Sequence, residues 1–233
     1  MAPGIDLNAD LGEGVTDDAG LLAVVTSANV ACGFHAGDEA LMRAVCTEAA
    51  RRGVAVGAQV SYADRAHFGR VDVEVAEDVL AGQVAEQVAL LSAVAHGCGL
   101  EVEYVKPHGA LYNRAVHDPA HARAVLAGSG RLPVLGLPGS VLLALAADAG
   151  RTVRREGFPD RAYTDDGRLV PRGEPGAVLD DPALIAARAV AMARSGAVDS
   201  VCVHGDSPVA VAAARQARRR LEDAGFEVRP HRP

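Results

Sequence analysis

The sequence has few cysteines and no closely spaced pair of them. Cys32, Cys46, Cys98 and Cys202 lie far apart, and no Cys-X-X-Cys motif occurs. Disulfide-rich secreted domains and zinc ribbons depend on closely spaced cysteines. We therefore expect all four thiols to be reduced packing residues, and the protein to be cytoplasmic.

Signals for export and for the membrane are also missing. Residues 1–10 lack the positively charged start and apolar stretch of a signal peptide. The longest apolar candidate, residues 134–149, is interrupted by Pro138, Gly139 and Asp148, whereas a membrane span needs about 20 apolar residues. We expect no membrane partner.

An excess of positive charge is the third absence. The formal net charge is −7 over 233 residues. The one basic run, Arg218, Arg219 and Arg220, is typical of the solvated face of a helix. These features exclude nucleic acid as the expected partner.

What is present is an alternation of short β-branched runs with alanine-rich stretches of helical period, which predicts a parallel α/β fold. The predicted strands are residues 5–8, 28–31, 54–58, 103–105, 134–137, 152–155, 200–203 and 227–229. The predicted helices are residues 39–52, 76–96, 120–127, 140–149, 182–193 and 208–224. The length and the absence of a linker predict one domain over residues 1–233.

Two α/β architectures fit this alternation. A doubly wound sheet would carry a Gly-X-Gly-X-X-Gly turn after its first strand, but Gly12-Glu13-Gly14 lacks the third glycine. An eightfold barrel takes about 250 residues, so this chain is slightly short for one. We therefore expect an irregular, distorted or incomplete TIM-like β/α barrel.

Polar residues that can do chemistry follow five of the predicted strands, where parallel α/β folds bind their ligands. The segments are residues 8–13, 32–38, 59–64, 106–109 and 204–206. Taken singly, Asp38 is typical of a helix cap, Asn8 of a loop residue, and a lone histidine of a structural hydrogen bonder. The joint pattern favours a site. The loop of residues 158–176 is long enough to line it.

The residue types in these segments suit hydrolysis of an amide. Asp10 and Glu13, with His35, His108 and His204, can supply a general base, a proton donor or a hard-metal site, and Lys106 can neutralise a carboxylate or phosphate. A nucleophile is not apparent. Ser61 lacks the Gly-X-Ser-X-Gly elbow, and Cys32 falls inside a predicted strand.

At these same residues the sequence resembles the LamB/YcsF family, whose members are the A subunits of 5-oxoprolinase. The segments that carry the resemblance are residues 5–14, 26–38, 105–113, 160–163, 169–172 and 201–206. The resemblance implies an irregular β/α barrel related to polysaccharide-deacetylase-type hydrolases. It also implies ATP-dependent cleavage of 5-oxoproline to L-glutamate in a complex with subunits B and C, with ATP as the co-substrate of that complex.

The sequence departs from the family pattern in three places. Gln59 stands where the family usually has histidine, Ala63 stands where it commonly has proline, and residues 192–202 are shorter than is typical. Glutamine is a poor transition-metal ligand and cannot act as a base. We therefore expect no tightly bound metal.

A mechanism for the family reaction can be written on these residues. Asp10 and His35 orient the water or act as base, His108 or His204 protonates the leaving nitrogen, and Lys106 and Arg161 hold carboxylate or phosphate charge. The other expected substrate contacts are Asn8, Glu13, Asn113 and Asp206. The sequence has no recognisable nucleotide cradle, so phosphorylation of the lactam oxygen is expected elsewhere in the complex.

Two other interpretations fit the same residues. The first is a metal-dependent amide or ester deacetylase that works alone. It requires a stoichiometric metal and activity without ATP. The second is a non-catalytic ligand-binding or regulatory subunit, with Gln59 as the first loss from its site.

Overall fold

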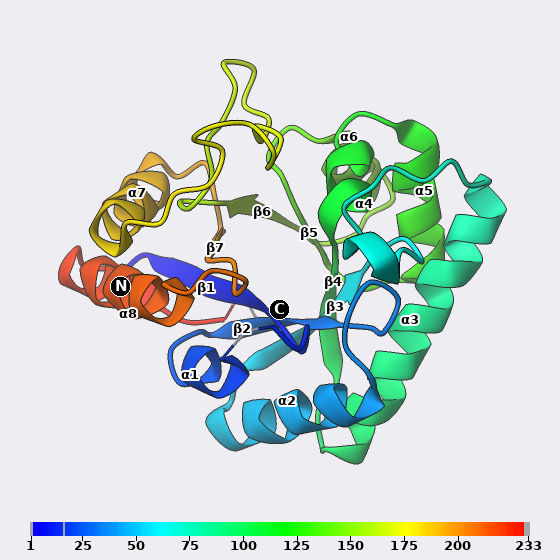
Figure 1. The fold of residues 1–233 in the computed structure, drawn as a ribbon, viewed down its shortest axis with the longest axis horizontal. Helices are drawn as coiled ribbons and strands as arrows, with labels where there is room; N and C mark the ends of the chain where they lie inside the picture. Colours follow the sequence, from blue (N-terminus) through cyan, green and yellow to red (C-terminus); the bar gives the residue numbers. More distant parts are fainter. Residues whose placement is uncertain (1, 16, 231–233) are drawn as a thin grey trace.

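A closed parallel barrel forms the centre of the protein (Figure 1). The computed structural model describes residues 2–15 and 17–230. Its strands follow the order β2-β3-β4-β5-β6-β7-β1-β8, and β1 also pairs with β2, so seven strands close the barrel and β8 extends β1. The strands are β1 Gly4–Leu11, β2 Ser27–Ala31, β3 Ala55–Val60, β4 Val102–Pro107, β5 Val134–Gly136, β6 Val153–Gly157, β7 Ser200–Cys202 and β8 Glu227–Val228. The prediction of an irregular β/α barrel is confirmed.

Helices surround the barrel on its outside (Figure 1). They are α1 Asp18–Leu22, α2 Glu39–Arg52, the 3-10 turn η1 Arg65–His67, α3 Glu77–Gly97, α4 Gly109–Ala115, α5 Pro119–Gly128, α6 Val141–Asp148, α7 Pro182–Ser195 and α8 Ala210–Asp223. Asp38 caps α2 by accepting a hydrogen bond from the Leu41 amide at 2.9 Å, as its sequence position predicts. The short elements α1, η1 and α4 were not predicted, because so few residues show no helical period.

The predicted strand ends were wrong at four places. β1, β3, β4 and β6 run two or three residues beyond their predicted ends, so that Asp10, Gln59 and Lys106 lie within strands and not after them. Cys32, in contrast, lies just beyond β2. The strands were predicted too short because their polar residues resemble loop residues.

Those polar residues face the inside of the barrel. Along β1, alternate residues from Ile5 to Leu11 are apolar and buried, whereas Asp6, Asn8 and Asp10 point to the other face and are also buried. A helix-covered strand normally has apolar residues on both faces. The interior of this barrel is therefore a polar core.

Hydrogen bonds connect the polar residues of β1 to those of the neighbouring strands. Ser200 Oγ donates to Asp6 at 2.5 Å and accepts from Asn8 Nδ2 at 2.7 Å. Asn29 Nδ2 donates both to Asn8 Oδ1 at 2.7 Å and to Asp10 Oδ1 at 2.9 Å. An unbroken series of hydrogen bonds thus runs from Asp6 to Asp10, along the inside of β1.

The longest helix, α3, is a better candidate for a membrane span than residues 134–149, which were expected from the sequence to be the longest apolar stretch. By length and composition α3 could cross a membrane, with 21 residues and a window of mean hydropathy 1.2. It packs instead against β3, β4, α2 and α5, and buried Gln87 on it bonds both backbone groups of Ser61 at 2.9 Å. Core helices of globular proteins pass the same test, so the finding is weak evidence for a membrane.

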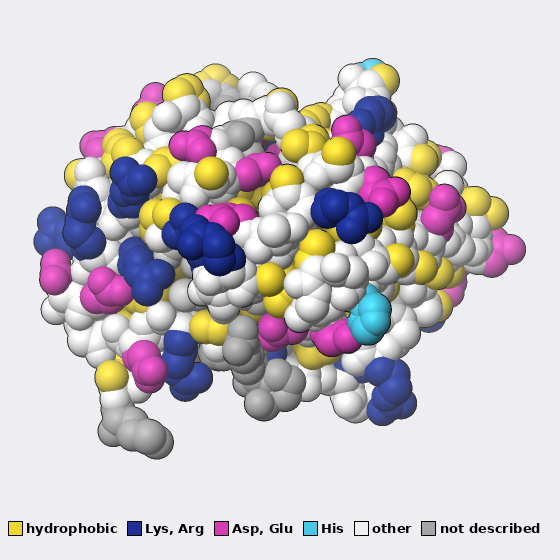
Figure 2. Space-filling model, turned by 90° about the horizontal axis from the view of Figure 1, so that it is seen from below, with side chains coloured by type: hydrophobic (Ala, Val, Ile, Leu, Met, Phe, Trp, Pro, Cys, Tyr) yellow, Lys and Arg dark blue, Asp and Glu magenta, His cyan; other side chains and the backbone are white. Residues whose placement is uncertain are grey.

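The surface carries mixed charge. Figure 2 shows one face on which basic, acidic and hydrophobic side chains are interspersed. In the basic run, Arg219 and Arg220 are exposed, and Arg218 pairs with Glu222 at 2.9 Å and donates to the Val24 carbonyl at 2.5 Å. The run is a solvated helix face, as predicted.

Candidate active site

A pocket opens at the carboxyl ends of the barrel strands. Its empty volume is about 370 Å³. Its lining comes from β1, the segment after η1, the end of β4 with α4, the segment after β6 and the segment after β7. The lining residues are Asp10, Arg70, Lys106, Pro107, His108, Gly109, Tyr112, Asn113, Phe158, Arg161, Leu169, Arg172 and His204. The predicted loop of residues 158–176 supplies four of these residues and lines the site as expected.

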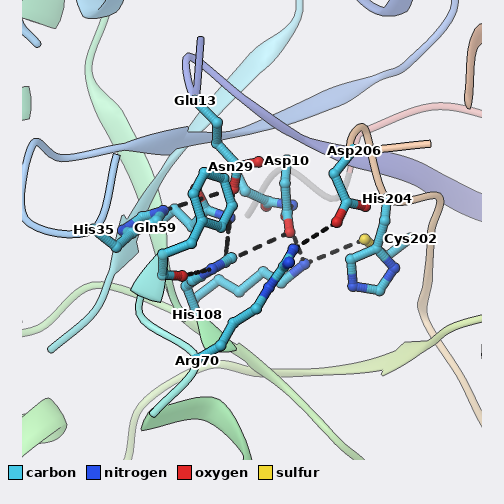
Figure 3. A network of polar contacts seen from close by, with 12 residues as sticks. Asp10, Glu13, Asn29, His35, Gln59, Arg70, His108, Cys202, His204 and Asp206 are labelled. Carbon is cyan, nitrogen blue, oxygen red and sulfur yellow. Dashed lines mark hydrogen bonds and ion pairs between the residues drawn. The ribbon is translucent and has the colours of Figure 1, made fainter. Parts of the chain in front are cut away.

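The structure brings most of the predicted site residues to this pocket. Those that line it are Asp10, Lys106, His108, Asn113, Arg161 and His204. Asn8, Glu13, His35 and Asp206 do not. Asn8 lies deeper in the polar core, Glu13 and His35 lie beside His108, and Asp206 lies next to the arginines of the pocket mouth (Figure 3).

Asp10 and Lys106 form a buried ion pair at the bottom of the pocket. Lys106 Nζ lies 3.0 Å from Asp10 Oδ1 and 2.8 Å from Glu156 Oε1. Burial opposes ionisation of Asp10, but the Lys106 ammonium holds its pKa well below its usual range. Asp10 is therefore an ionised carboxylate facing the pocket, able to orient a water molecule by accepting its hydrogen bond.

The same geometry changes what Lys106 can do. Its side chain is buried, and its ammonium already lies between the carboxylates of Asp10 and Glu156. Burial works against this charge, but the two carboxylates raise the pKa of Lys106 well above its usual value. Its charge is balanced within the chain, so the contact it makes best is with Asp10 and not with a substrate anion.

Beside this pair lies a cluster with the spacing of metal ligands. One ligand atom from each of Glu13, His35 and His108 lies within 4.8 Å of the others. Gln59 reaches into the cluster, with Nε2 3.0 Å from Glu13 Oε1 and 2.9 Å from His108 Nδ1. The Gln59 amide thus lies between two of the three ligand atoms.

His108 contacts a neighbouring residue through each of its ring nitrogens. Its Nδ1 faces the Gln59 amide nitrogen, and its Nε2 lies 3.1 Å from the Phe68 carbonyl. A carbonyl can only accept, so Nε2 carries a proton, and Nδ1 accepts from Gln59. Both ring nitrogens of His108 are therefore engaged within the chain.

His35 is buried behind His108. The two rings stack at 4.1 Å between centroids, and neither nitrogen of His35 has a hydrogen-bond partner among the described residues. Burial, together with His108, lowers the pKa of His35. His35 is therefore neutral and separated from the pocket by the ring in front of it.

A second imidazole faces the pocket from the opposite side. His204 Nδ1 lies 3.0 Å from Asp160 Oδ2, and its ring stacks on Phe158 at 5.2 Å. Burial opposes ionisation of Asp160, but His204 lowers its pKa. A buried carboxylate that holds one ring nitrogen orients the other nitrogen, as in many acid–base sites.

Four charged residues of the site were missed from the sequence. Glu156 and Asp160 lie on or just after β6, where the alternation of Arg154 and Glu156 could have revealed an inward polar face. Arg70 and Arg172 lie on loops and carry no local signal, since the residue that joins them, Asp206, is far away in the sequence.

The lining offers acid–base chemistry without a side-chain nucleophile. No serine or cysteine of the described residues lines the pocket. Burial raises the pKa of Cys202 well above its usual value, although Lys106 opposes this, so the thiol stays protonated. An ionised carboxylate with two imidazoles supports attack by water.

A comparison with family models decides the relationship of the chain, since the LamB/YcsF family model matches residues 5–233. The chain belongs to the LamB/YcsF family. The A subunit of 5-oxoprolinase from Streptomyces avermitilis is 56% identical over 245 residues, covering 96% of this chain and 98% of that protein.

Solved structures agree with this LamB/YcsF assignment. The lactam utilization protein from Thermus thermophilus is 38% identical, with a TM-score of 0.91 over 98% of this chain and 100% of that one. A peptidoglycan N-acetylglucosamine deacetylase catalytic domain from Eubacterium rectale is 12% identical, with a TM-score of 0.56 over 100% of this chain and 90% of that one. The latter shows a shared fold alone and confirms the expected link to deacetylase-type barrels.

Proposed function

We propose that this LamB/YcsF chain is the A subunit of an ATP-dependent 5-oxoprolinase, which cleaves 5-oxo-L-proline to L-glutamate together with subunits B and C. The observation that carries the proposal is the meeting of Asp10, His108 and His204 on one pocket. Near full-length similarity to a protein named as a 5-oxoprolinase A subunit supports it. So does the likeness to a structure described as a lactam utilization protein.

The chemistry explains why ATP and other subunits are needed. A lactam is resonance-stabilised and resists attack by water. Transfer of the γ-phosphoryl group of ATP to the lactam oxygen makes the ring carbon electrophilic. Water then adds to that carbon, the carbon–nitrogen bond breaks and the nitrogen takes up a proton, which leaves an acyl phosphate. A second water hydrolyses this acyl phosphate, so that phosphate leaves and the carboxylate of glutamate forms. Since this sequence has no glycine-rich phosphate loop, the phosphoryl transfer belongs to subunits B and C.

The residues divide this work among them. Asp10, ionised and on the pocket, orients the attacking water by accepting its hydrogen bond. His204, held by Asp160, delivers a proton to the departing nitrogen. His108 lines the same pocket, but both of its ring nitrogens are already engaged, so we assign the proton transfer to His204, while His35 acts by positioning the His108 ring.

The proposal includes a site without a tightly held metal, in a reducing cytoplasm. The Gln59 amide already bonds Glu13 and His108, and so uses the lone pairs that a metal would need. All four cysteines are free thiols, and three of them are buried, which suits a reducing compartment.

Reconstitution tests the proposal. The purified chain alone should not turn over 5-oxoproline, with or without ATP, and addition of subunits B and C should produce glutamate and inorganic phosphate in equal amounts. Robust turnover by the single chain would contradict the division of labour. Failure of the complete mixture to form glutamate would contradict the function itself.

The spacing of Glu13, His35 and His108 favours one alternative, a metal-dependent amide deacetylase that works alone. That function requires about one metal ion per chain and hydrolysis of an N-acetylated substrate without ATP. Elemental analysis of chelator-free protein, followed by an acetate-release assay, separates the two functions.

A further inference from the structure

Three segments far apart in the sequence meet at the mouth of the pocket. Arg70 follows η1, Arg172 belongs to the long segment after β6, and Asp206 follows β7. Asp206 Oδ2 lies 2.5 Å from Arg70 and 3.0 Å from Arg172, so one carboxylate oxygen bridges two guanidinium groups (Figure 3 shows the Arg70 contact).

The two arginines line the pocket, but the carboxylate that joins them does not. Asp206 therefore reaches the guanidinium groups from outside the lining. Arg70 is held further by the ring of Phe68, whose centroid lies 4.8 Å from the guanidinium carbon. Both guanidinium groups are positioned before any ligand enters.

A third arginine in the same pocket has no acidic partner in the part of the chain that the structure describes. Arg161 is 4% exposed and donates to the carbonyls of Ala177 at 3.2 Å and Val170 at 2.6 Å. Among residues 2–15 and 17–230, no carboxylate lies within ion-pair distance of it. A buried cation without an ion-pair partner favours entry of an anion.

The charge of the lining points the same way. The chain has a net charge of −7, yet its pocket is lined by Arg70, Lys106, Arg161 and Arg172 against the single carboxylate of Asp10. Lys106 is balanced by Asp10 and Glu156. The positive charge open to a ligand is therefore that of the three arginines.

We propose that Arg70 and Arg172 form an anion clamp for the ligand, and that Asp206 is a built-in substitute that occupies the clamp until the ligand's carboxylate or phosphate displaces it. Guanidinium groups suit this exchange because they bind carboxylates and phosphates through two parallel hydrogen bonds. For its ligand the clamp rests on the proposed function: 5-oxoproline brings a carboxylate, and its activated form brings a phosphate as well. The sequence predicts a direct contact between Asp206 and the substrate. In this geometry Asp206 instead competes with the substrate anion for Arg70 and Arg172.

Calorimetry on the full chain tests the clamp with two probes, inorganic phosphate and 5-oxoproline, and with 2-pyrrolidinone as the same lactam without a carboxylate. Asp206→Asn should tighten binding of an anionic probe about tenfold, because both arginines are released. Adding Arg70→Gln or Arg172→Gln in that background should weaken it about tenfold, and affinity for 2-pyrrolidinone should not respond.

Arg168→Gln is the matched control, because Arg168 lies on the same segment but pairs with Asp166 at 3.0 Å, away from the pocket. A response with phosphate alone assigns the clamp to the phosphoryl group, and a response with 5-oxoproline alone assigns it to the carboxylate. Unchanged affinity for both anions in Arg70→Gln and Arg172→Gln, or weaker binding in Asp206→Asn, overturns the proposal. Phosphate binding needs no partner protein, so a failed reconstitution refutes the function and leaves the clamp standing.

Discussion

At the scale of single residues, the Gln59 amide occupies the position that a metal ion would take between Glu13 and His108. Its amide donates to Glu13 and to His108, the two groups that a metal ion would bridge. We expect Gln59→His to take up about one zinc ion per chain, since a fourth ligand then joins Glu13, His35 and His108. Wild-type protein should hold well below one.

Elemental analysis after dialysis against zinc measures the difference. Gln216→His on α8 controls for unspecific binding to an added imidazole. Equal zinc content in Gln59→His and in this control would show that position 59 does not complete a site.

Asp10 has both a catalytic role and a structural role. Asp10→Asn should slow glutamate formation by the reconstituted complex about a hundredfold to ten-thousandfold, because the neutral amide cannot orient the attacking water as the carboxylate does. The sequence placed Asp10 on a loop, but it lies in β1 and pairs with Lys106. The variant should therefore also lose about 1–3 kcal/mol in its free energy of unfolding.

Turnover and thermal melting of the same samples check both parts. Asp165→Asn, an exposed change in the loop after β6, should affect neither. If Asp10→Asn melts lower but keeps normal turnover, Asp10 is a purely structural residue.

At the scale of elements, two backbones meet without side chains between them. The Ala110 amide, at the start of α4, donates to the Gly69 carbonyl at 2.9 Å. A Cβ on Gly109 would lie 2.3 Å from that carbonyl, and Gly109 has φ +60°. This contact fixes the loop that carries Phe68 and Arg70 against the site.

Gly109→Ala should therefore push that loop away, lowering both the melting temperature and the turnover of the complex. Gly139→Ala is the matched control: it has φ +75° but open space around the new Cβ, so it carries only the backbone strain, about 1 kcal/mol. Equal effects of the two variants on turnover would show that loop contact does not matter for activity.

The elements also show what a sequence can predict. The long helices α2, α3, α7 and α8 were found because of their helical period, and in α2 and α7 an aspartate cap and a C-terminal glycine agree with it. Strand ends were missed where inward polar residues resembled loops. The same error hid Glu156, while pairing across distant loops hid Arg70 and Arg172. Asp10, Lys106, His108 and His204 were found because parallel strands bring their ends to one place.

At the scale of the whole molecule, buried carboxylates link stability to pH. Interactions with positive groups lower the pKa of Asp10, Asp160 and Asp206 in the folded state. Stability from these groups is present above the pKa of an unfolded aspartate, about 3.9, and is lost as pH falls through and below it. Burial raises the pKa of Glu156, so Glu156 works in the opposite direction at higher pH.

We therefore expect the melting temperature to fall steeply only below about pH 4. Asp160→Asn should make that fall shallower, because one depressed carboxylate is gone. Melting curves from about pH 3 to 7 measure it, and a melting temperature that keeps rising toward the acid end would mean that Glu156 outweighs the three aspartates.

The polar core of the barrel has a consequence for how such a sequence can evolve. In the series from Asp6 through Ser200, Asn8 and Asn29 to Asp10, each donor has its own acceptor. Replacing one member orphans a neighbour, whereas an apolar core tolerates exchange among residues of similar volume. Few single substitutions are therefore neutral inside this barrel. We expect its hydrogen-bonded polar residues to change together or not at all, whereas the residues of the outer helices are freer to vary.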